Sequence, residues 1–323
     1  MRMKLIGVAA LLCGSLCVAA QPGEAQTGTV QVRPAHAWSD PAHRMLLGAT
    51  RANTRIVAVG AHGIVVLSDD DGKTFRQARS VPVSSTLTDV SFADASHGWA
   101  VGQWGVVIAT ADGGETWTLQ RSDLTTDQPL FSVNFSDLHH GWAVGLWSLM
   151  LKTDDGGSHW TVVKLPPPPG SSKSDRNLFR IFANKGGTLF VAAEQGLVLR
   201  SRDNGTTWDY LKTGGKGSLW AGTATLDGAV YVGGLLGHLY VSRDDGDTWS
   251  PIDTGAGSSI TDLTTADGRL VGVGLDGLLI EGESNTRSIS AKHRQARDPL
   301  TAIVSSGTNA PVLFSKSGVV KGD

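Results

Sequence analysis

Five aspartates recur at one position of a repeated turn, where carboxylates could bind a metal ion or act as acids. They are Asp70, Asp112, Asp155, Asp203 and Asp244. Each lies in a copy of the pattern Ser/Thr-x-Asp-x-Gly-x-Thr-Trp, with small departures. A metal or catalytic site needs different partners brought to one place, whereas here a single turn is copied. The repetition therefore favours a structural role for all five carboxylates, and we expect no metal site and no cofactor.

The residue types of this turn, an Asp box, explain its shape. The Asp accepts hydrogen bonds from backbone N–H groups of its own turn, and the Gly permits a positive φ. The aromatic residue buries itself beneath the turn. The box glycines are Gly72, Gly114, Gly157, Gly205 and Gly246, and the tryptophans are Trp117, Trp160, Trp208 and Trp249. Each box is therefore predicted to join two strands of a hairpin.

The spacing of the boxes indicates the elements that position them. The closing aromatics are 42, 43, 48 and 41 residues apart, a period typical of four-stranded propeller blades. One copy reads Leu87–Phe92, Gly98–Gly102, Val106–Thr110 and Thr116–Gln120, four short β-rich runs separated by turn residues. Seven such units can be traced, the last two without the box. We predict an all-β, seven-bladed β-propeller forming one domain over residues 26–323.

The last unit has no fourth strand, because the chain ends at Asp323 shortly after a β-like run. At the other end, Thr29–Arg33, or the stretch on to Trp38, is β-like and belongs to no unit. An open ring would leave an unpaired sheet edge. We therefore predict that the N-terminal run supplies the missing outer strand, with residues 26–42 as closing strand and entry segment.

Residues 1–25 are typical of a secretory signal peptide. A short basic start precedes an apolar stretch from Leu5 to Ala20, and small residues allow cleavage after Ala20 or Ala25. The sequence therefore predicts an exported protein, periplasmic or secreted. A retained membrane anchor is the alternative.

Cysteine content and charge argue against a disulfide-bonded protein and against a nucleic-acid-binding protein. The two cysteines, Cys13 and Cys17, both lie in the leader, so we expect a mature protein without disulfides. The formal net charge is −2 and no Lys/Arg-rich run is present, which argues against nucleic-acid binding.

The turn between the second and third strands of each unit varies in its middle residue and usually ends in Gly. In a four-stranded blade these turns surround one mouth of the central channel. Exposed tryptophans there would favour recognition, because Trp is enriched at interface hot spots. The alternative is that they fold back against the next blade. The partner-binding candidates are His62, Gln103, Trp104, Trp147, Gln195, Leu235 and Leu236.

A proline-rich loop, Lys164–Asn177, accounts for the longest interval between boxes. Its four successive prolines favour a stiff extended segment followed by a polar one. Two interpretations stay open: a tolerated insertion between blades, or an arm that faces a partner.

Two phrases carry a family resemblance. Gly98–Gly102 with Ile108–Trp117, and Gly141–Gly145 with Thr153–Trp160, resemble the photosystem II stability/assembly factor-like propellers of the BNR/Asp-box families. The resemblance implies a seven-bladed propeller that binds protein partners during assembly of a membrane complex. We therefore expect a non-catalytic scaffold with a membrane-associated protein partner, and we expect the exported protein to be a monomer. The arginine-rich surface patch of the photosynthetic members has no match here, which favours a bacterial member with another partner.

Two other functions remain alternatives. Asp boxes also occur in sialidases, and Phe179–Ile181 is similar to the start of that family, but it follows the third box. A sialidase-like glycoside hydrolase needs three arginines and a Tyr paired with Glu, and Tyr231 has no nearby Glu in the sequence. Other glycosidases need two carboxylates brought together in space. The third reading is a propeller that binds a small ligand, such as a carbohydrate, at the channel mouth.

Overall fold

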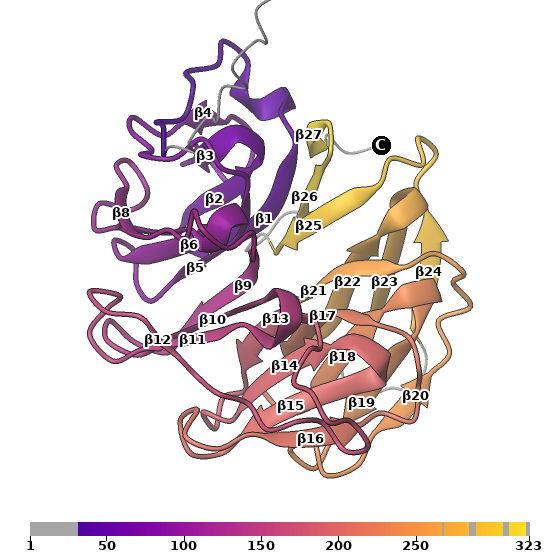
Figure 1. Cartoon of the computed structure of the whole chain (residues 1–323). Helices are drawn as coiled ribbons and strands as arrows, with labels where there is room; N and C mark the ends of the chain where they lie inside the picture. The colour runs from indigo at the N-terminus through magenta and orange to yellow at the C-terminus, as the bar shows by residue number, and fades with distance from the viewer. Residues whose placement is uncertain (1–31, 267, 284–288, 306–309, 321–323) are drawn as a thin grey trace, which may run out of the picture. The chain divides into compact units, whose positions relative to one another are not determined.

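Seven antiparallel sheets follow one another along the chain, and six of them have four strands. The computed structural model describes residues 32–266, 268–283, 289–305 and 310–320. Figure 1 shows the sheets around a common centre, with the last blade (yellow) beside the first (indigo). This confirms the predicted all-β, seven-bladed propeller with four-stranded blades. The signal-peptide segment and the first residues of the predicted closing run lie outside the described residues.

Each blade runs outward from an innermost strand that contacts the innermost strands of its neighbours. The innermost strands are β1 (Leu46–Ala52), β5 (Leu87–Phe92), β9 (Leu130–Phe135), β13 (Leu178–Ala183), β17 (Leu219–Ala224), β21 (Ile260–Ala266) and β25 (Leu300–Val304). The second strands are β2 (Arg55–Gly60), β6 (Gly98–Gly102), β10 (Gly141–Gly145), β14 (Leu189–Ala193), β18 (Val230–Gly234), β22 (Arg269–Gly274) and β26 (Val312–Ser315).

The remaining strands complete the blades toward the outside. The third strands are β3 (Val65–Ser68), β7 (Val107–Thr110), β11 (Met150–Thr153), β15 (Leu197–Ser201), β19 (Leu239–Ser242), β23 (Leu278–Glu283) and β27 (Gly318–Val320). The outer strands are β4 (Arg76–Gln77), β8 (Thr118–Arg121), β12 (Thr161–Val162), β16 (Asp209–Lys212), β20 (Ser250–Ile252) and β24 (Ser290–His293). In the described part of the chain, no helix has the length and apolar character of a membrane span.

The hydrophobic core lies between blades, because each sheet is covered on both faces by its neighbours. Residues of the second strands β6 and β10 are buried throughout. Trp99 of β6 stacks on Phe135 of the next blade, with ring centroids 3.5 Å apart. Gly141 leaves room for that ring, since a Cβ there would lie 2.4 Å from Phe135. The small residues of the Gly-Trp-Ala-Val-Gly runs thus let large aromatics interlock between sheets.

The Asp boxes form the turns between third and outer strands. In the fourth blade, Asp203 accepts the Thr207 N–H at 2.8 Å and the Thr207 hydroxyl at 2.6 Å. The Ser201 hydroxyl donates to Asp203 at 2.8 Å and accepts the Gly205 N–H at 2.8 Å. Gly205 has a φ of +75°, and the Trp208 indole N–H donates to its carbonyl at 3.2 Å. The carboxylate is therefore used within its own turn.

The described part of the N-terminal run differs from the predicted closing strand. Val32–Trp38 forms no strand, and the seventh sheet comprises β25, β26 and β27 among the described residues. The Ala35 N–H donates to Val81 O at 3.0 Å, and the Trp38 N–H donates to the Gln77 side chain at 2.9 Å. Val32 and Ala35 pack against the core between the first two blades. This segment therefore binds the first blade, and Trp38 also packs against the core that the first blade shares with the last.

Direct packing joins the first and last blades. The Thr301 hydroxyl donates to Leu46 O at 2.6 Å, and Arg51 Nε donates to Ser305 O at 2.6 Å. Both blades share one apolar core that includes Leu46 and Phe314. The short 3-10 helix η1 (Pro41–His43) contacts β27, and together these contacts close the ring.

Candidate functional site

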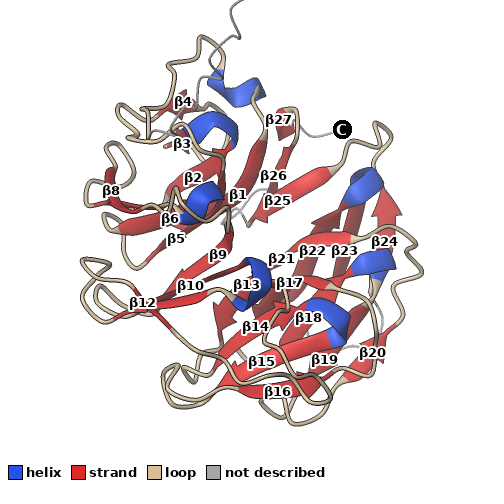
Figure 2. Ribbon diagram, in the orientation of Figure 1, coloured by secondary structure: helices blue, strands red, loops and turns tan. Residues whose placement is uncertain are grey.

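Six three-residue 3-10 turns connect the second and third strands of successive blades. They are η2 (Ala61–Gly63), η3 (Gln103–Gly105), η4 (Leu146–Ser148), η5 (Glu194–Gly196), η6 (Leu235–Gly237) and η7 (Leu275–Gly277). Figure 2 shows them as short blue segments around the centre, on the face turned toward the viewer. We call these turns the turn ring. They contain all seven residues predicted to bind a partner.

Backbone hydrogen bonds hold each turn beside the start of an innermost strand. Leu235 N–H donates to Ser218 O at 3.0 Å, and Gln103 N–H donates to Thr86 O at 2.9 Å. The turns also lean on the next blade, as Leu236 N–H donates to the Ser259 hydroxyl at 3.1 Å. Because the innermost strands line the axis, the turn ring surrounds one mouth of the channel.

The middle residue of every turn in the ring has a left-handed backbone. These residues have φ values of 51–61° and are His62, Trp104, Trp147, Gln195, Leu236 and Asp276. For an ordinary L-residue this conformation costs roughly 1–2 kcal/mol. Glycine, Asn or Asp would relieve that cost, yet three of the six positions hold Trp or Leu. The conformational preference of the backbone therefore does not explain why Trp and Leu occupy these positions.

The predicted binding residues differ in exposure. Trp147 is 57% exposed and Leu236 is 60% exposed, and Leu235 is 37% exposed. His62, Gln103 and Gln195 are exposed as well. Trp104 differs, because it is half-buried and packs against the core of the first two blades. The sequence could not distinguish the two tryptophans, since both stand at the same position of the repeat.

Three aromatic residues that the sequence analysis missed lie at the second position of the innermost strands β9, β13 and β17. They are Phe131, Phe179 and Trp220, all half-buried. Phe131 stacks on Phe179 with centroids 5.7 Å apart and planes inclined by 15°. None of the three belongs to an inter-blade core of the described chain. We call them the aromatic arc, which lies at the strand ends nearest the turn ring.

Other blades show what this position does without an aromatic residue. The Thr88 hydroxyl donates to Leu130 O at 2.8 Å, and the Thr261 hydroxyl donates to Leu300 O at 2.9 Å. Each threonine thus ties its innermost strand to the next blade. The residues of the aromatic arc have no hydroxyl group, so three consecutive blades cannot form this hydrogen bond. Aligning the innermost strands of the repeat could have revealed the arc.

A charged cluster lies one residue deeper, on the channel axis. Arg180 Nη1 of the fourth blade lies 3.0 Å from Asp89 Oδ1 of the second blade. Asp89 Oδ2 accepts the Ser132 hydroxyl at 2.7 Å and the Val133 N–H at 3.1 Å. The Ser132 hydroxyl in turn accepts the Ile181 N–H at 3.2 Å. These groups satisfy the free edges of innermost strands and join three blades.

Asp262 of the sixth blade is the second carboxylate of this cluster. Its oxygens accept the Leu263 N–H at 2.9 Å and the Ile303 N–H at 3.0 Å. Burial raises the pKa of Asp262 to about 6, against the lowering effect of the Arg180 charge. A cavity of about 230 Å³ adjoins the cluster and is lined in part by Arg51, Arg180 and Asp262. The channel interior is therefore polar, and its carboxylates have charged or hydrogen-bonding partners within the protein.

Comparison with known proteins places the chain in a family. Residues 77–127 and 118–279 match the family model described as "Photosynthesis system II assembly factor YCF48", which covers more than half of the chain. The chain belongs to this family. The match confirms the resemblance found in the repeated phrases.

Individual members of the YCF48 family are distant. The chain is 40% identical over 136 residues to the photosystem II assembly protein Ycf48 of Thermosynechococcus vestitus, a stretch covering 42% of this chain and 38% of that protein. The alignment thus spans well under two thirds of this relative. A structure described as YCF48 bound to D1 peptide has a TM-score of 0.69 at 15% identity, covering 90% of this chain and 98% of that one. YCF48 from Cyanidioschyzon merolae has a TM-score of 0.67 at 15% identity, covering 86% and 95%. At these identities the structural likeness shows the fold.

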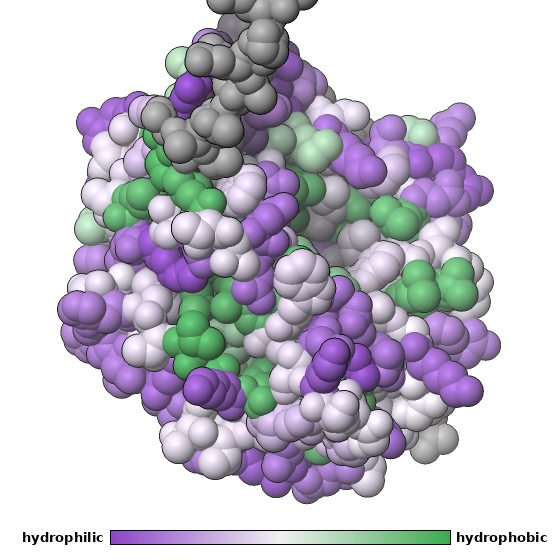
Figure 3. Space-filling view, viewed as in Figure 1, coloured by the Kyte–Doolittle hydropathy of each residue, from purple (hydrophilic) through white to green (hydrophobic). Residues whose placement is uncertain are grey.

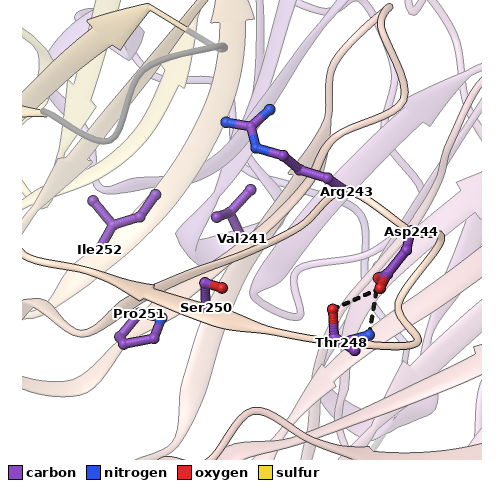
Figure 4. A pocket seen from close by; sticks show the side chains of 7 residues that line it. All are labelled: Val241, Arg243, Asp244, Thr248, Ser250, Pro251 and Ile252. Carbon is purple, nitrogen blue, oxygen red and sulfur yellow. Dashed lines mark hydrogen bonds between the residues drawn. The ribbon is translucent and has the colours of Figure 1, made fainter.

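A second cavity, of about 400 Å³, lies beside strands β19 and β20, away from the turn ring. Figure 4 shows that its one carboxylate, Asp244, bonds to Thr248 within the Asp box, while Arg243 points away from Asp244. Because the Asp244 carboxylate already accepts hydrogen bonds within its own turn, we do not place the functional site in this cavity.

The glycosidase alternative needs two carboxylates that can reach a substrate. Asp89 and Asp262 both face the channel, but Arg180 pairs with Asp89, and burial raises the pKa of Asp262 to about 6 against the charge of Arg180. The remaining oxygens accept hydrogen bonds from the protein. Tyr231, the tyrosine considered as a nucleophile, is 1% exposed. This geometry neutralises the carboxylates within the protein instead of presenting them to a sugar.

Proposed function

We propose that this chain is an exported, non-catalytic scaffold that binds a membrane-associated protein partner through the turn ring and the aromatic arc. Membership of the YCF48 family supports an assembly role. A related solved structure holds a D1 peptide, which supports a protein segment as the kind of ligand. The partner here is a membrane protein during assembly, and it need not belong to photosystem II.

The observation that carries this proposal is the state of Trp147 and Leu236. Both have left-handed backbones and expose more than half of their side chains. In the free protein the left-handed backbone costs conformational free energy at both residues, and burial of the side chains does not offset that cost. A partner that covered them would supply the missing burial, and a buried Trp is a frequent interface hot spot.

The surroundings of these two residues suggest the chemistry of the partner surface. Trp147 belongs to the third blade and Leu236 to the fifth, the outer two of the three blades that carry the aromatic arc. Figure 3 shows apolar patches separated by polar residues on this face. We infer that the partner contributes an apolar segment over the third to fifth blades, surrounded by polar contacts.

The arginines that come together elsewhere do not favour an acidic partner. Arg55 and Arg76 meet at the first two blades, but both pair with Asp69 and with Glu115. Since each guanidinium already has carboxylate partners, this cluster offers little net positive charge. It differs in this way from the arginine-rich patch expected of photosynthetic members.

Site-specific photocrosslinking in the native host tests the proposal. A photoreactive residue at position 147 should form crosslinks to a specific membrane-associated protein. The matched control is position 226, because Leu226 is 82% exposed but lies in the turn between β17 and β18, at the opposite end of its blade. The same crosslinks from both positions, or none from position 147, would refute the proposal.

A further inference from the structure

Four consecutive prolines, Pro166–Pro169, lie in the loop between β12 and β13. The proline ring fixes φ near −65°, and each residue that precedes a proline is kept extended. Leu165 to Pro168 all precede a proline, so covalent geometry forces this run into a polyproline II helix. We call Lys164–Lys173 the proline strap.

Burial along the strap repeats every third residue. Leu165 and Pro168 are buried, whereas Pro166, Pro167 and Pro169 are exposed. Leu165 belongs to the core shared by the third and fourth blades. A polyproline II helix has three residues per turn, so one edge faces the protein and two edges face solvent. Pro166 and Pro169, three residues apart, share an exposed edge.

Hydrogen bonds hold the strap in place. The Ser174 hydroxyl donates to Leu165 O at 2.8 Å and to Pro166 O at 2.7 Å. Beyond the strap, Ser148 N–H donates to Arg176 O at 2.6 Å, and Arg176 N–H donates to the Ser148 hydroxyl at 3.0 Å. The strap is therefore ordered before any partner arrives, which lowers the entropy cost of binding.

The charge of the strap has one sign. Lys164 and Lys173 are exposed at its two ends, and the sequence between them contains no acidic residue. A partner groove with acidic residues at its margins would complement these ends, while its centre would contact only proline rings.

We propose that the proline strap is a ligand, presented by this chain to a partner domain whose groove is lined by aromatic side chains and flanked by carboxylates. Aromatic grooves recognise pre-formed polyproline II helices with prolines at the spacing of Pro166 and Pro169. The strap shares no residue with the turn ring or the aromatic arc. It extends the function proposed above from one docking surface to two.

An SH3 domain with an aromatic groove and acidic margins is a direct probe of this ligand. The ¹⁵N-labelled domain is titrated with the unlabelled mature chain, and resonances of the groove residues should shift. The Pro166→Ala/Pro169→Ala variant should bind roughly tenfold more weakly, or worse. The matched control is Pro251→Ala, because Pro251 is an exposed proline on β20, outside the strap.

Charge reversal provides the second arm of the same experiment. Lys164→Glu/Lys173→Glu should weaken binding and reduce its dependence on salt. Thermal melting should show all variants folded, since every altered side chain is exposed. Absence of groove shifts with the parent chain, or equal affinity of the double proline variant, would overturn the proposal. Crosslinking at position 147 does not depend on the strap, so the two proposals can fail separately.

Discussion

At the scale of single residues, the box aspartates show how repetition separates structural carboxylates from functional ones. The Thr207 hydroxyl and N–H hold the pKa of Asp203 at about 2, well below its ordinary value. The corresponding groups of Thr74 and Thr248 hold the pKa of Asp70 and Asp244 at about 2. In the third blade the N–H and ring of His159 hold the pKa of Asp155 at about 2. Their own turns bind the charged form, so these carboxylates stay charged at a lower pH than a free aspartate does.

Replacing one box carboxylate should therefore affect stability alone. Asp203→Ala leaves the Thr207 N–H and hydroxyl without their acceptor, so we expect a melting temperature lower by about 2–8 °C. Asp154→Ala is the control, since Asp154 is an exposed box residue outside the turn's hydrogen bonds. Differential scanning calorimetry measures both. A variant with unchanged melting and lost partner binding would contradict the structural role.

Replacing the two turn-ring tryptophans should lower the free energy of unfolding by different amounts. Trp104→Ala removes a half-buried ring from the core of the first two blades, so unfolding free energy should fall by about 1–3 kcal/mol. Trp147→Ala removes a ring that is 57% exposed, and the loss should stay under about 1 kcal/mol. Urea unfolding of both variants checks the difference. Equal losses would show that Trp147 also packs in solution.

The channel cluster predicts an unusual pH dependence. Burial raises the pKa of Asp262 from 3.8 to about 6, so the fold disfavours its charged form. This penalty is absent below about pH 4, grows as pH rises to about 6, and then stays constant. The melting temperature of the parent minus that of Asp262→Asn should therefore be larger at pH 5 than at pH 7.5. Parallel melting curves for the two proteins over this range would refute the assignment.

At the scale of elements, the described segment Val32–Trp38 is placed by contacts with the first blade. Arg44 lies over the Trp38 ring, 4.2 Å from its centroid, and Gln77 binds the Trp38 backbone. Gln77 lies 39 residues further along the chain, so its contact with Trp38 cannot be predicted from the local sequence pattern. Fold class and blade repeat were predictable, because they depend on local turns and periodicity.

Deleting residues through Trp38 distinguishes the two accounts of closure. The backbone hydrogen bonds of Ala35 and Trp38 predict faster hydrogen exchange in residues 76–83 of the first blade. The effect on β27 should be smaller, because Val319 of β27 meets Trp38 through a shared apolar core and not through backbone hydrogen bonds. A closing strand on the seventh blade would instead protect β27. Exchange that rises first in residues 318–320 would contradict the structure on this point.

The channel cluster and the aromatic arc were not predictable, for a related reason. Arg180 and Asp89 are 91 residues apart, and they meet only because the second and fourth blades face one axis. Phe131 and Phe179 meet because consecutive blades place the same position side by side. Both arrangements depend on how the blades assemble, which the spacing of one repeat does not specify.

At the scale of the whole molecule, the two ends of the propeller differ in structure. The Asp boxes lie at the end where third strands pass to outer strands, and their polar groups bond within each turn. The turn ring, the aromatic arc and the end of the proline strap's loop lie at the other end, where Trp147 N–H donates to Asn177 at 3.1 Å. Among the described residues, the apolar side chains on left-handed backbones, Trp104, Trp147 and Leu236, all lie at this second end, where we propose recognition.

The central claim is that this end binds a protein through Trp147 and Leu236. Once crosslinking has named the partner, calorimetry measures its affinity for the parent, Trp147→Ala/Leu236→Ala and Leu226→Ala proteins. Truncation of hot-spot residues typically costs ~2 kcal/mol or more, so the double variant should bind at least roughly thirtyfold more weakly with nearly parental melting. Leu226→Ala should bind like the parent. Parental affinity in the double variant, or an equal loss in Leu226→Ala, would contradict the account.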